Sequence, residues 1–453
     1  MILINNIYLI ITIITGNKST HNIVMYMFTA LSIKTKETNN TLWEELSPAS
    51  PNSCRVLSLL LGKESEACLK NLYKTLINKR VELQSSPISI LYKGRVLKFY
   101  IIFKMSMIDH KLRQMLSGQG GAFCILCTCS REDAVCLLYS FTINKTSAQI
   151  TEIWNKLSSG QLKKRPHDQD VRMGVTRESL IDLESIASIS PLHALLRFFD
   201  FLLKIIYHLN ANIFNWSEEK KVLGDEKYSQ LQITKNYVRA LLKEKTNISV
   251  DMPDATGKGG TSTNGNVVHS LLSKEKNLEV MVSAVPEKFQ KALHECLTRC
   301  YVILKLYNSM HKINVDSFKT FCVETKKCLL TSFNENEHNW IYFTPTVHAV
   351  LDHSGDLIES NYCTGLGAYT ESSLECNNKI LRLIRIALSR KTNQVDNLND
   401  CLNRMWVRSD IHVRSAVSEK RHFRRSETTE YRFQGPLPLV TLADHYIRDL
   451  VVE

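Results

Sequence analysis

The chain has 453 residues, of which 44% are hydrophobic and 23% are charged. These fractions are close to those of ordinary globular proteins, so the chain can bury a sizeable core and wholesale disorder is excluded. Lys and Arg number 57 against 45 Asp and Glu. The resulting net charge of +12 favours a polyanionic partner, either nucleic acid or an anionic membrane surface. Residues 376–425 carry much of this excess, with 12 basic against 4 acidic side chains.

The 13 cysteines are odd in number and lack the dense spacing of a small disulfide scaffold, which indicates a reducing compartment. Residues 1–16 are apolar but short for a membrane span, and no positive residue precedes them. We expect a buried strand there, with a signal or anchor and a gene-model artefact as alternatives. No later segment is apolar for long enough to cross a membrane. The basic run at 420–425 indicates a nuclear address or a phosphate-contacting patch, unless it is a solvated charged tail.

Hydrophobic patterns predict strands first and helices later, which is an α+β order. The expected strands cover residues 23–33 and 95–103, the second of them buried. A glycine-rich stretch at 257–261 lacks the spacing of a phosphate-binding loop, and it lies in an expected linker at 251–266. The expected helices cover residues 64–79, 110–116, 192–209 (apolar nearly all round, hence buried), 278–284 and 289–310.

Two pairs of metal-ligating residue types stand far apart in the chain. Cys124 and Cys127 form a C-x-x-C pair, and His348 and His353 are five residues apart, within the range of spacings that zinc sites use. Together they would form a Cys2His2 site that closes a long loop and leaves no open position for catalysis. The alternative is a buried thiol pair unrelated to a helix with two surface histidines, and the spacing alone does not decide between them.

Carboxylates and basic residues form a second candidate constellation. Asp109 follows an apolar run at the expected exit of a strand, and Glu375 lies in a helical segment with Lys379 and Arg382 on the same face. Such carboxylates could jointly hold Mg²⁺, while Lys379, Arg382 and Arg385 could bind DNA phosphates. The plain alternatives are a helix N-cap for Asp109 and an ion pair with Lys379 for Glu375.

Several segments of the sequence resemble segments of one known family and occur in the same order. The string GLGAYTESSLECNNKILRLIRIALSRK, with DNLNDCLNRMWVRSD after it, resembles the end of the catalytic core of the V(D)J recombination-activating protein 1 and Transib transposase family. The resemblance continues backward through TPTVHAVLDH, NGNVVHSLLSKE, SISPLHALLRFFDFLLKIIY, FCILC, the strand that ends before Asp109, and WEELSPASPNSCRVLSLLL. These blocks run from about residue 43 to residue 410.

The resemblance implies a ribonuclease-H-like core of the DDE transposase type, interrupted by a large, mostly helical insertion that binds structural zinc. In that family, Mg²⁺ or Mn²⁺ supports DNA nicking and strand transfer on double-stranded DNA in the nucleus. Asp109 then corresponds to the second acid of the triad and Glu375 to the last, and Cys124, Cys127, His348 and His353 correspond to the zinc ligands. A homodimer and a kelch-type accessory partner are also implied, and no membrane.

The family pattern fails at the first acid of the triad. The first acidic residue of the chain is Glu37, whereas the family places an Asp on an earlier strand; Asn5 and Asn6 are the nearest polar candidates. An amide carries no negative charge to bind a second hard cation. We therefore expect either an impaired enzyme or a chain whose true first exon is missing, with a catalytically inactive DNA- or partner-binding module as the alternative function.

The amino-terminal RING and zinc region and the nonamer-binding domain of the family have no counterpart in these residues. The expected organisation is a strand-rich core at 1–120, a cysteine-bearing part of the insertion at 121–210, a helical part ending in the histidine pair at 211–364, a closing helix with its basic region at 365–425, and a tail at 426–453.

Overall fold

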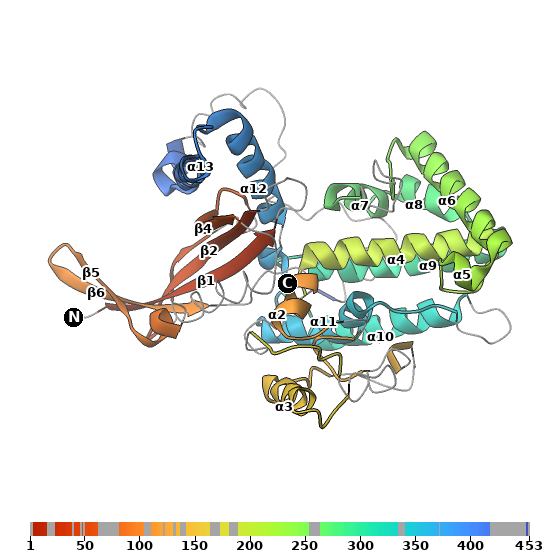
Figure 1. The fold of residues 1–453 in the computed structure, drawn as a ribbon, viewed down its shortest axis with the longest axis horizontal. Helices are drawn as coiled ribbons and strands as arrows, with labels where there is room; N and C mark the ends of the chain where they lie inside the picture. The colour runs from red at the N-terminus through yellow and green to blue at the C-terminus, as the bar shows by residue number, and fades with distance from the viewer. Residues whose placement is uncertain are drawn as a thin grey trace.

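A sheet built from the first hundred residues lies beside a larger helical body in the computed structural model (Figure 1). The architecture is therefore mixed α and β and mostly helical. The structure describes residues 3–15, 23–38, 40–45, 48, 50–61, 81–103, 110–120, 123–129, 133–135, 142–163, 173–180, 189–252, 263–333, 340–370, 372–416 and 450–451.

The strands are β1 (Leu3–Thr15), β2 (Ile23–Thr35), β3 (Thr41–Glu44), β4 (Cys54–Leu61), β5 (Ile88–Tyr92) and β6 (Arg95–Phe103). The helices are α2 (His110–Leu116), α3 (Ser147–Ser158), α4 (Pro191–Ala211), α5 (Lys220–Leu223), α6 (Asp225–Thr246), α7 (Gly265–Leu272), α8 (Glu275–Ser283), α9 (Glu287–Tyr307), α10 (Val315–Thr331), α11 (Pro345–Ser360), α12 (Ser372–Leu383) and α13 (Gln394–Ser409). Short turns of helix are η1 (Asp133–Val135), η4 (Gly367–Tyr369) and the π-helical turn η5 (Ile384–Leu388).

The sheet has the order β3-β2-β1-β6-β5, and β4 also pairs with β2. The long β1 and β2 are antiparallel, while β1 and β6 run parallel, from Leu3 opposite Leu97 to Leu9 opposite Phe103. Lys93 and Gly94 both have positive φ in the two-residue turn that joins β5 to β6, the conformation a tight hairpin requires. The parallel pair puts the exit of β6 at the same end of the sheet as the exit of β1.

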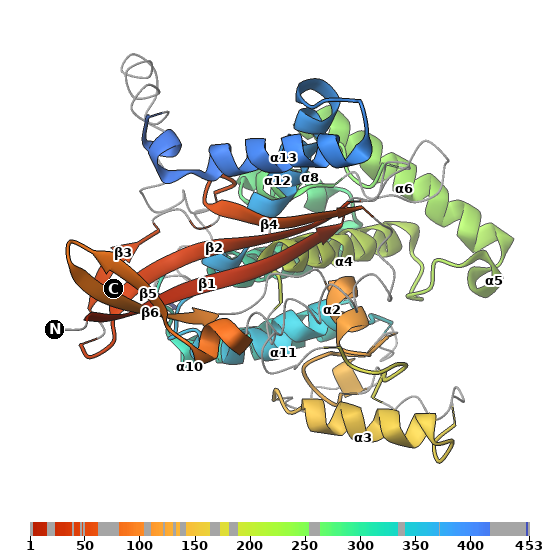
Figure 2. The same cartoon turned by 60° about the vertical axis from the view of Figure 1, so that its left-hand side comes forward.

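Helices α12 and α13 cover the β4 side of the sheet (Figure 2). The indole of Trp406 on α13 donates a hydrogen bond of 2.7 Å to the carbonyl oxygen of Val56 on β4. Arg414 forms an ion pair with Glu45 at 3.1 Å and donates to the Ser53 hydroxyl at 3.3 Å. These contacts bring residues about 350 positions apart in the chain together and fix the carboxy-terminal helices on the sheet.

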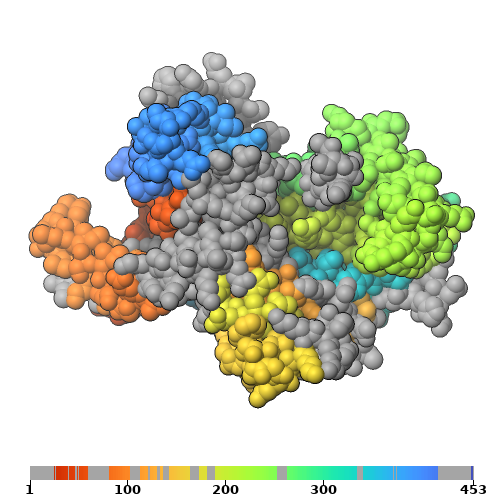
Figure 3. All heavy atoms as spheres, viewed as in Figure 1, coloured from red at the N-terminus to blue at the C-terminus, as the bar shows by residue number. Residues whose placement is uncertain are grey.

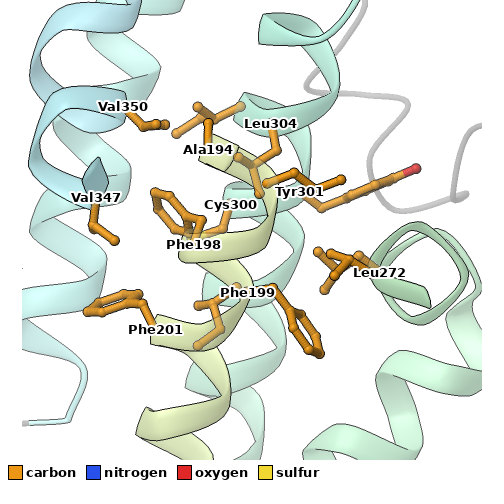
Figure 4. Packing of buried hydrophobic residues seen from close by; sticks show 14 of the residues in the cluster. Ala194, Phe198, Phe199, Phe201, Leu272, Cys300, Tyr301, Leu304, Val347 and Val350 are labelled. Atoms are coloured by element: carbon orange, nitrogen blue, oxygen red, sulfur yellow. The ribbon is translucent and has the colours of Figure 1, made fainter. Parts of the chain in front are cut away.

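The core of the helical body surrounds α4. Its apolar side chains pack against α7, α9 and α11, and Figure 4 shows Phe198 and Phe199 among Cys300, Leu272 and Val347. Both phenylalanine side chains are fully buried. Helix α4 begins at Pro191 after the N-cap Ser190 and ends at Ala211, where the left-handed backbone of the C-cap Asn212 terminates it.

The structure confirms the predicted strands at 23–33 and 95–103 and the predicted helices at 110–116, 192–209, 278–284 and 289–310, with boundary shifts of up to a few residues. Residues 1–16 contain strand β1, as expected. The prediction that the strand at 95–103 is buried is wrong, because Ile101 is the only buried side chain among those described there, and Val96 is 45% exposed where the β5–β6 hairpin extends past the sheet. The predicted helix at 64–79 lies outside the described residues, as do residues 253–262 of the expected linker.

The burial of Phe198 generates a stability prediction. We expect Phe198→Ala to lower the free energy of unfolding by about 3–5 kcal/mol, because it leaves a cavity between α4, α9 and α11. Arg197→Ala, at the exposed neighbouring position, should change it by less than about 0.5 kcal/mol. Urea denaturation followed by circular dichroism measures both, and equal midpoints for the two variants would contradict the placement of this core.

Candidate metal centre and carboxylate helix

Two cysteines and two histidines meet in the interior. One ligand atom from each of Cys124, Cys127, His348 and His353 lies within 4.8 Å of the others, and all four residues are buried. The Cys127 sulfur is 3.2 Å from Nε2 of His348. The alternative of an isolated thiol pair and two surface histidines is therefore wrong, since His348 is 2% and His353 0% exposed.

The cysteines project from a turn that follows α2 and the sheet. The backbone N–H of Leu126 donates to the Cys124 sulfur at 3.4 Å, and the N–H groups of Asn144 and Lys145 both donate to the carbonyl oxygen of Leu126 at 3.1 Å. The buried ammonium of Lys145 donates to the carbonyl oxygen of Cys124 and to Oε1 of Gln119 at 2.9 Å. Burial lowers the pKa of Lys145, whereas the neighbouring thiols raise it. These bonds hold the turn rigid around its two sulfurs.

The histidines project from α11, which begins after the N-cap Thr344. Their rings lie at right angles with centroids 5.0 Å apart. Both ring nitrogens of His353 are buried and have no hydrogen-bond partner among the described residues. A buried imidazole without partners is costly unless something else binds it, and a metal ion would do so.

A carboxylate orients the other imidazole. Nδ1 of His348 lies 2.8 Å from Oδ2 of Asp352, and the Lys326 ammonium on α10 lies 2.9 Å from Oδ1 of the same carboxylate. Burial lowers the pKa of His348, but the contacts with Asp352 and Cys124 together outweigh burial and raise that pKa to about 9. Burial raises the pKa of Asp352, yet His348 and Lys326 together hold it below its usual value. A carboxylate behind a histidine ligand fixes which nitrogen faces the metal.

The donor set fits zinc. Two thiolates and two imidazoles are the ligands of closed tetrahedral zinc sites, and no carboxylate oxygen belongs to the cluster. The contact with Cys124 lowers the pKa of the Cys127 thiol, but Cys129 and burial outweigh it and raise that pKa to about 12. A metal ion would have to displace this proton on binding.

Helix α12 carries the second candidate constellation. The Cys54 thiol donates to Ser373 at 3.2 Å, and the Asn377 side chain donates to the carbonyl oxygen of Pro51 at 2.9 Å. Ser373 and Asn377 are one turn apart and buried, so they fix the rotation of the helix on the sheet. Glu375 lies between them in sequence and is exposed.

The three basic residues proposed to bind DNA differ in their position and exposure at the end of α12. Lys379 and Arg382 are exposed on the helix together with Glu375. Arg385 lies in the π-helical turn η5 and is partly buried. Asp109 lies outside the described residues, so its approach to Glu375 stays a prediction. Asn5 and Asn6 lie on β1 opposite Phe99 and Tyr100 of β6.

Comparisons with known proteins bear on this arrangement. A family model described as the RNase H domain of recombination-activation protein 1 (RAG1) matches residues 12–123, which contain β2–β6 and α2. V(D)J recombination-activating protein 1 of Xenopus laevis is 23% identical over 424 residues, covering 87% of this chain and 37% of that protein. The chain is similar to RAG1 over most of its length.

Two mammalian relatives agree with this result. The RAG1 proteins of Sus scrofa and Oryctolagus cuniculus are each 23% identical, covering 90% and 87% of this chain. The chain spans only 38% and 37% of the length of those relatives. Within the described part of the chain, no helix is both long enough and apolar enough to span a membrane.

The sequence analysis missed the residues that support the metal ligands. Asp352 lies one helical turn after His348, a spacing that could have pointed to it. Lys326 and Lys145 carry no such local signal, because their partners lie 26 and 21 residues away in the chain.

Loss of one ligand should release the metal. We expect one zinc per chain in the purified protein, and Cys127→Ser or His353→Ala should abolish it and broaden the thermal unfolding transition. The measurements are elemental analysis and calorimetry. Cys401→Ser, which removes a buried thiol on α13, should keep the zinc. Unchanged zinc in both ligand variants would reject the four-ligand site.

The carboxylate behind His348 gives a separate prediction. Asp352→Asn should weaken zinc affinity by about 10–100-fold, because the imidazole loses the group that orients it. Competition with a chromogenic chelator measures the affinity. Asp352→Asn alone leaves the buried Lys326 ammonium without its carboxylate partner. The double variant Asp352→Asn, Lys326→Met removes that ammonium too, and its zinc affinity should also be reduced. Wild-type affinity in a folded double variant would show that the carboxylate does not act on the metal.

Proposed function

We propose that this chain is the DNA-binding and zinc-binding part of a recombination-activating-type protein. In this proposal, a ribonuclease-H-like sheet is interrupted after β6 by a mostly helical, zinc-binding insertion, and α12 is the helix on which the chain returns to the sheet. The order of elements supports it. The cysteine turn follows β6 and α2, the histidines lie on α11 just before the return, and α12 packs on β1. The domain boundaries stated from the sequence are part of the same proposal.

The observation that carries the proposal is the basic surface of α12. Lys379 and Arg382 are exposed on a helix whose rotation is fixed by Ser373 and Asn377, so the cations keep a constant position relative to the sheet. Figure 3 shows part of the α12 and α13 layer, in blue, at the molecular surface. A fixed array of cations on a surface binds the phosphates of double-stranded DNA and releases counterions.

Not every cation in this layer is equally available. Arg390 donates to both carboxylate oxygens of Asp400 at 2.9 and 3.0 Å, so its charge is neutralised within the protein. Arg404 and Arg408 are exposed on α13, which packs against η5. We therefore assign phosphate binding to Lys379, Arg382 and Arg385 first, and to the α13 arginines second.

The chemistry of the family is Mg²⁺- or Mn²⁺-dependent DNA nicking and strand transfer. Whether this chain retains that activity depends on its metal-binding carboxylates. Glu375 and Asp109 would each supply an oxygen ligand for a divalent cation. Strand β1, parallel to β6, has no Asp or Glu in the sequence from Leu3 to Thr15. We propose that catalysis is impaired in this chain for want of the third carboxylate, and a catalytically inactive DNA- or partner-binding module is the second candidate. Nuclear localisation, a homodimer and a kelch-type partner are proposed from the resemblance alone.

A salt titration tests DNA binding. The logarithm of the affinity for a fluorescent duplex should fall linearly with the logarithm of the salt concentration. Changing Lys379, Arg382 and Arg385 together to Gln should reduce that slope by about 2–3. The matched control changes the exposed Lys227, Lys276 and Lys291 to Gln on α6, α8 and α9, with the same loss of charge but no change of slope.

The same preparations test the chemistry. With Mg²⁺ or Mn²⁺ we expect duplex binding without nicking, seen as intact supercoiled plasmid. Nicking that is abolished by Glu375→Gln or Asp109→Asn would overturn the impairment and establish an active nuclease. Equal slopes in the two triple variants would overturn the assignment of DNA binding to α12.

A further inference from the structure

Two cysteines on neighbouring helices of the helical body lie sulfur to sulfur. Cys296 on α9 and Cys328 on α10 have their Sγ atoms 3.0 Å apart, although 32 residues separate them in the chain. Neither belongs to the Cys124, Cys127, His348 and His353 cluster. A disulfide has a sulfur separation of about 2.05 Å, so the two atoms would need to approach by only about 1 Å.

The two thiols differ in their surroundings. Cys296 is fully buried, whereas Cys328 is partly exposed and also lies 3.6 Å from the Ser332 hydroxyl. The contact with the Cys296 thiol lowers the pKa of Cys328, Ser332 and Arg299 lower it further, and burial and Glu295 oppose them. The contact with Cys328, together with burial, raises the pKa of Cys296. Cys328 is therefore the better nucleophile and is also the one that solvent reaches.

We propose that Cys296 and Cys328 form an oxidation-sensitive thiol pair that a hydroperoxide converts into a disulfide between α9 and α10. This site does not depend on the proposed DNA-binding function. Cys300, one turn along α9, and Cys322 on α10 are also buried, but each lacks the short sulfur contact. The contact and the partial exposure of Cys328 single out one pair among the buried thiols of these two helices.

The chemistry balances with the hydroperoxide as the oxidant. The Cys328 thiolate attacks one peroxide oxygen, the O–O bond breaks, and the second oxygen leaves as water or an alcohol after taking up a proton. The product is a sulfenic acid on Cys328. The Cys296 sulfur then attacks the Cys328 sulfur, the S–O bond breaks, and water leaves with the thiol proton. The two thiols lose two electrons in total, and the peroxide gains them.

The disulfide would close a loop that contains the second half of α9 and most of α10. Because crosslinking restricts the unfolded chain, it should raise the thermal midpoint of this body. Lys326 lies two residues before Cys328 on α10, so the crosslink would anchor the helix that supports Asp352.

Peptide mapping of the full chain tests the proposal. Reduced, desalted protein is titrated with hydrogen peroxide, and remaining thiols are alkylated. Peptides from a double digest with trypsin and Glu-C, which separates Cys328 from Cys363 and Cys376, are analysed by mass spectrometry. We expect a peptide crosslinked through Cys296 and Cys328 at the lowest peroxide dose, two hydrogens lighter than the reduced pair and reversed by dithiothreitol. Cys296→Ser should stop the reaction at a Cys328 sulfenic acid that dimedone traps.

Control variants separate this pair from general thiol oxidation. Cys300→Ser should leave the crosslink unchanged, whereas Cys328→Ser should abolish both the crosslink and the dimedone adduct. Zinc measured in the same samples shows whether the Cys124 and Cys127 thiols are attacked first. Full alkylation of Cys296 and Cys328 after a peroxide dose that already oxidises the partly exposed Cys363 and Cys376 would overturn the proposal in the wild-type protein itself.

Discussion

The contact between a cysteine turn and a histidine-bearing helix, 221 residues apart in the chain, is the constraint on which the rest of the arrangement depends. The turn leaves the sheet region after α2, and α11 leads back to it through η4 and α12. Joining these two points closes a long loop, and closing it costs conformational entropy. Without the cysteine–histidine cluster, the packing of the helices alone would have to offset that cost. Lys145 supports the cysteine turn, and Asp352 with Lys326 supports the histidine-bearing helix, so both parts of the chain that meet at the cluster are held in place. The ligand geometry is thus held from the turn and from two helices at once.

The two halves of the molecule are stabilised in different ways. Around α4 the packing is almost purely apolar, with Phe198 and Phe199 fully buried between helices that come from distant parts of the chain. Helix α12 instead meets the sheet through specific hydrogen bonds from Ser373 and Asn377, and α13 through Trp406. Apolar packing tolerates small rotations, whereas paired buried polar groups do not, because each shift would leave a donor or acceptor unsatisfied. The helix that presents Glu375 is the one held by the more exacting contacts.

Local patterns were sufficient for some of the elements, but β4, α6 and α10 were among those not predicted. The unbroken apolar run of α4 and the strand ending at Phe103 are visible in the sequence. The spacing of two cysteines and two histidines marked all four as candidates, and the family resemblance favoured one joint site. What the sequence could not supply depends on tertiary position. Lys326 looks like any charged helical residue until its carboxylate partner is known, and Ser373 and Asn377 look like surface residues of an amphipathic helix. The exposure of Val96 likewise follows from a hairpin that extends beyond its neighbours.

The π-helical turn at Ile384–Leu388 has a consequence for how such a chain can vary in length. A π turn accommodates an extra residue within a helix, and each residue rotates the following segment by about 100°. Deleting one residue here would restore regular α-helical winding after α12 and swing the segment leading to α13 away from β4. The indole of Trp406 would then lose its carbonyl acceptor on Val56. Insertions and deletions should therefore be tolerated in the loops around this turn far better than within it.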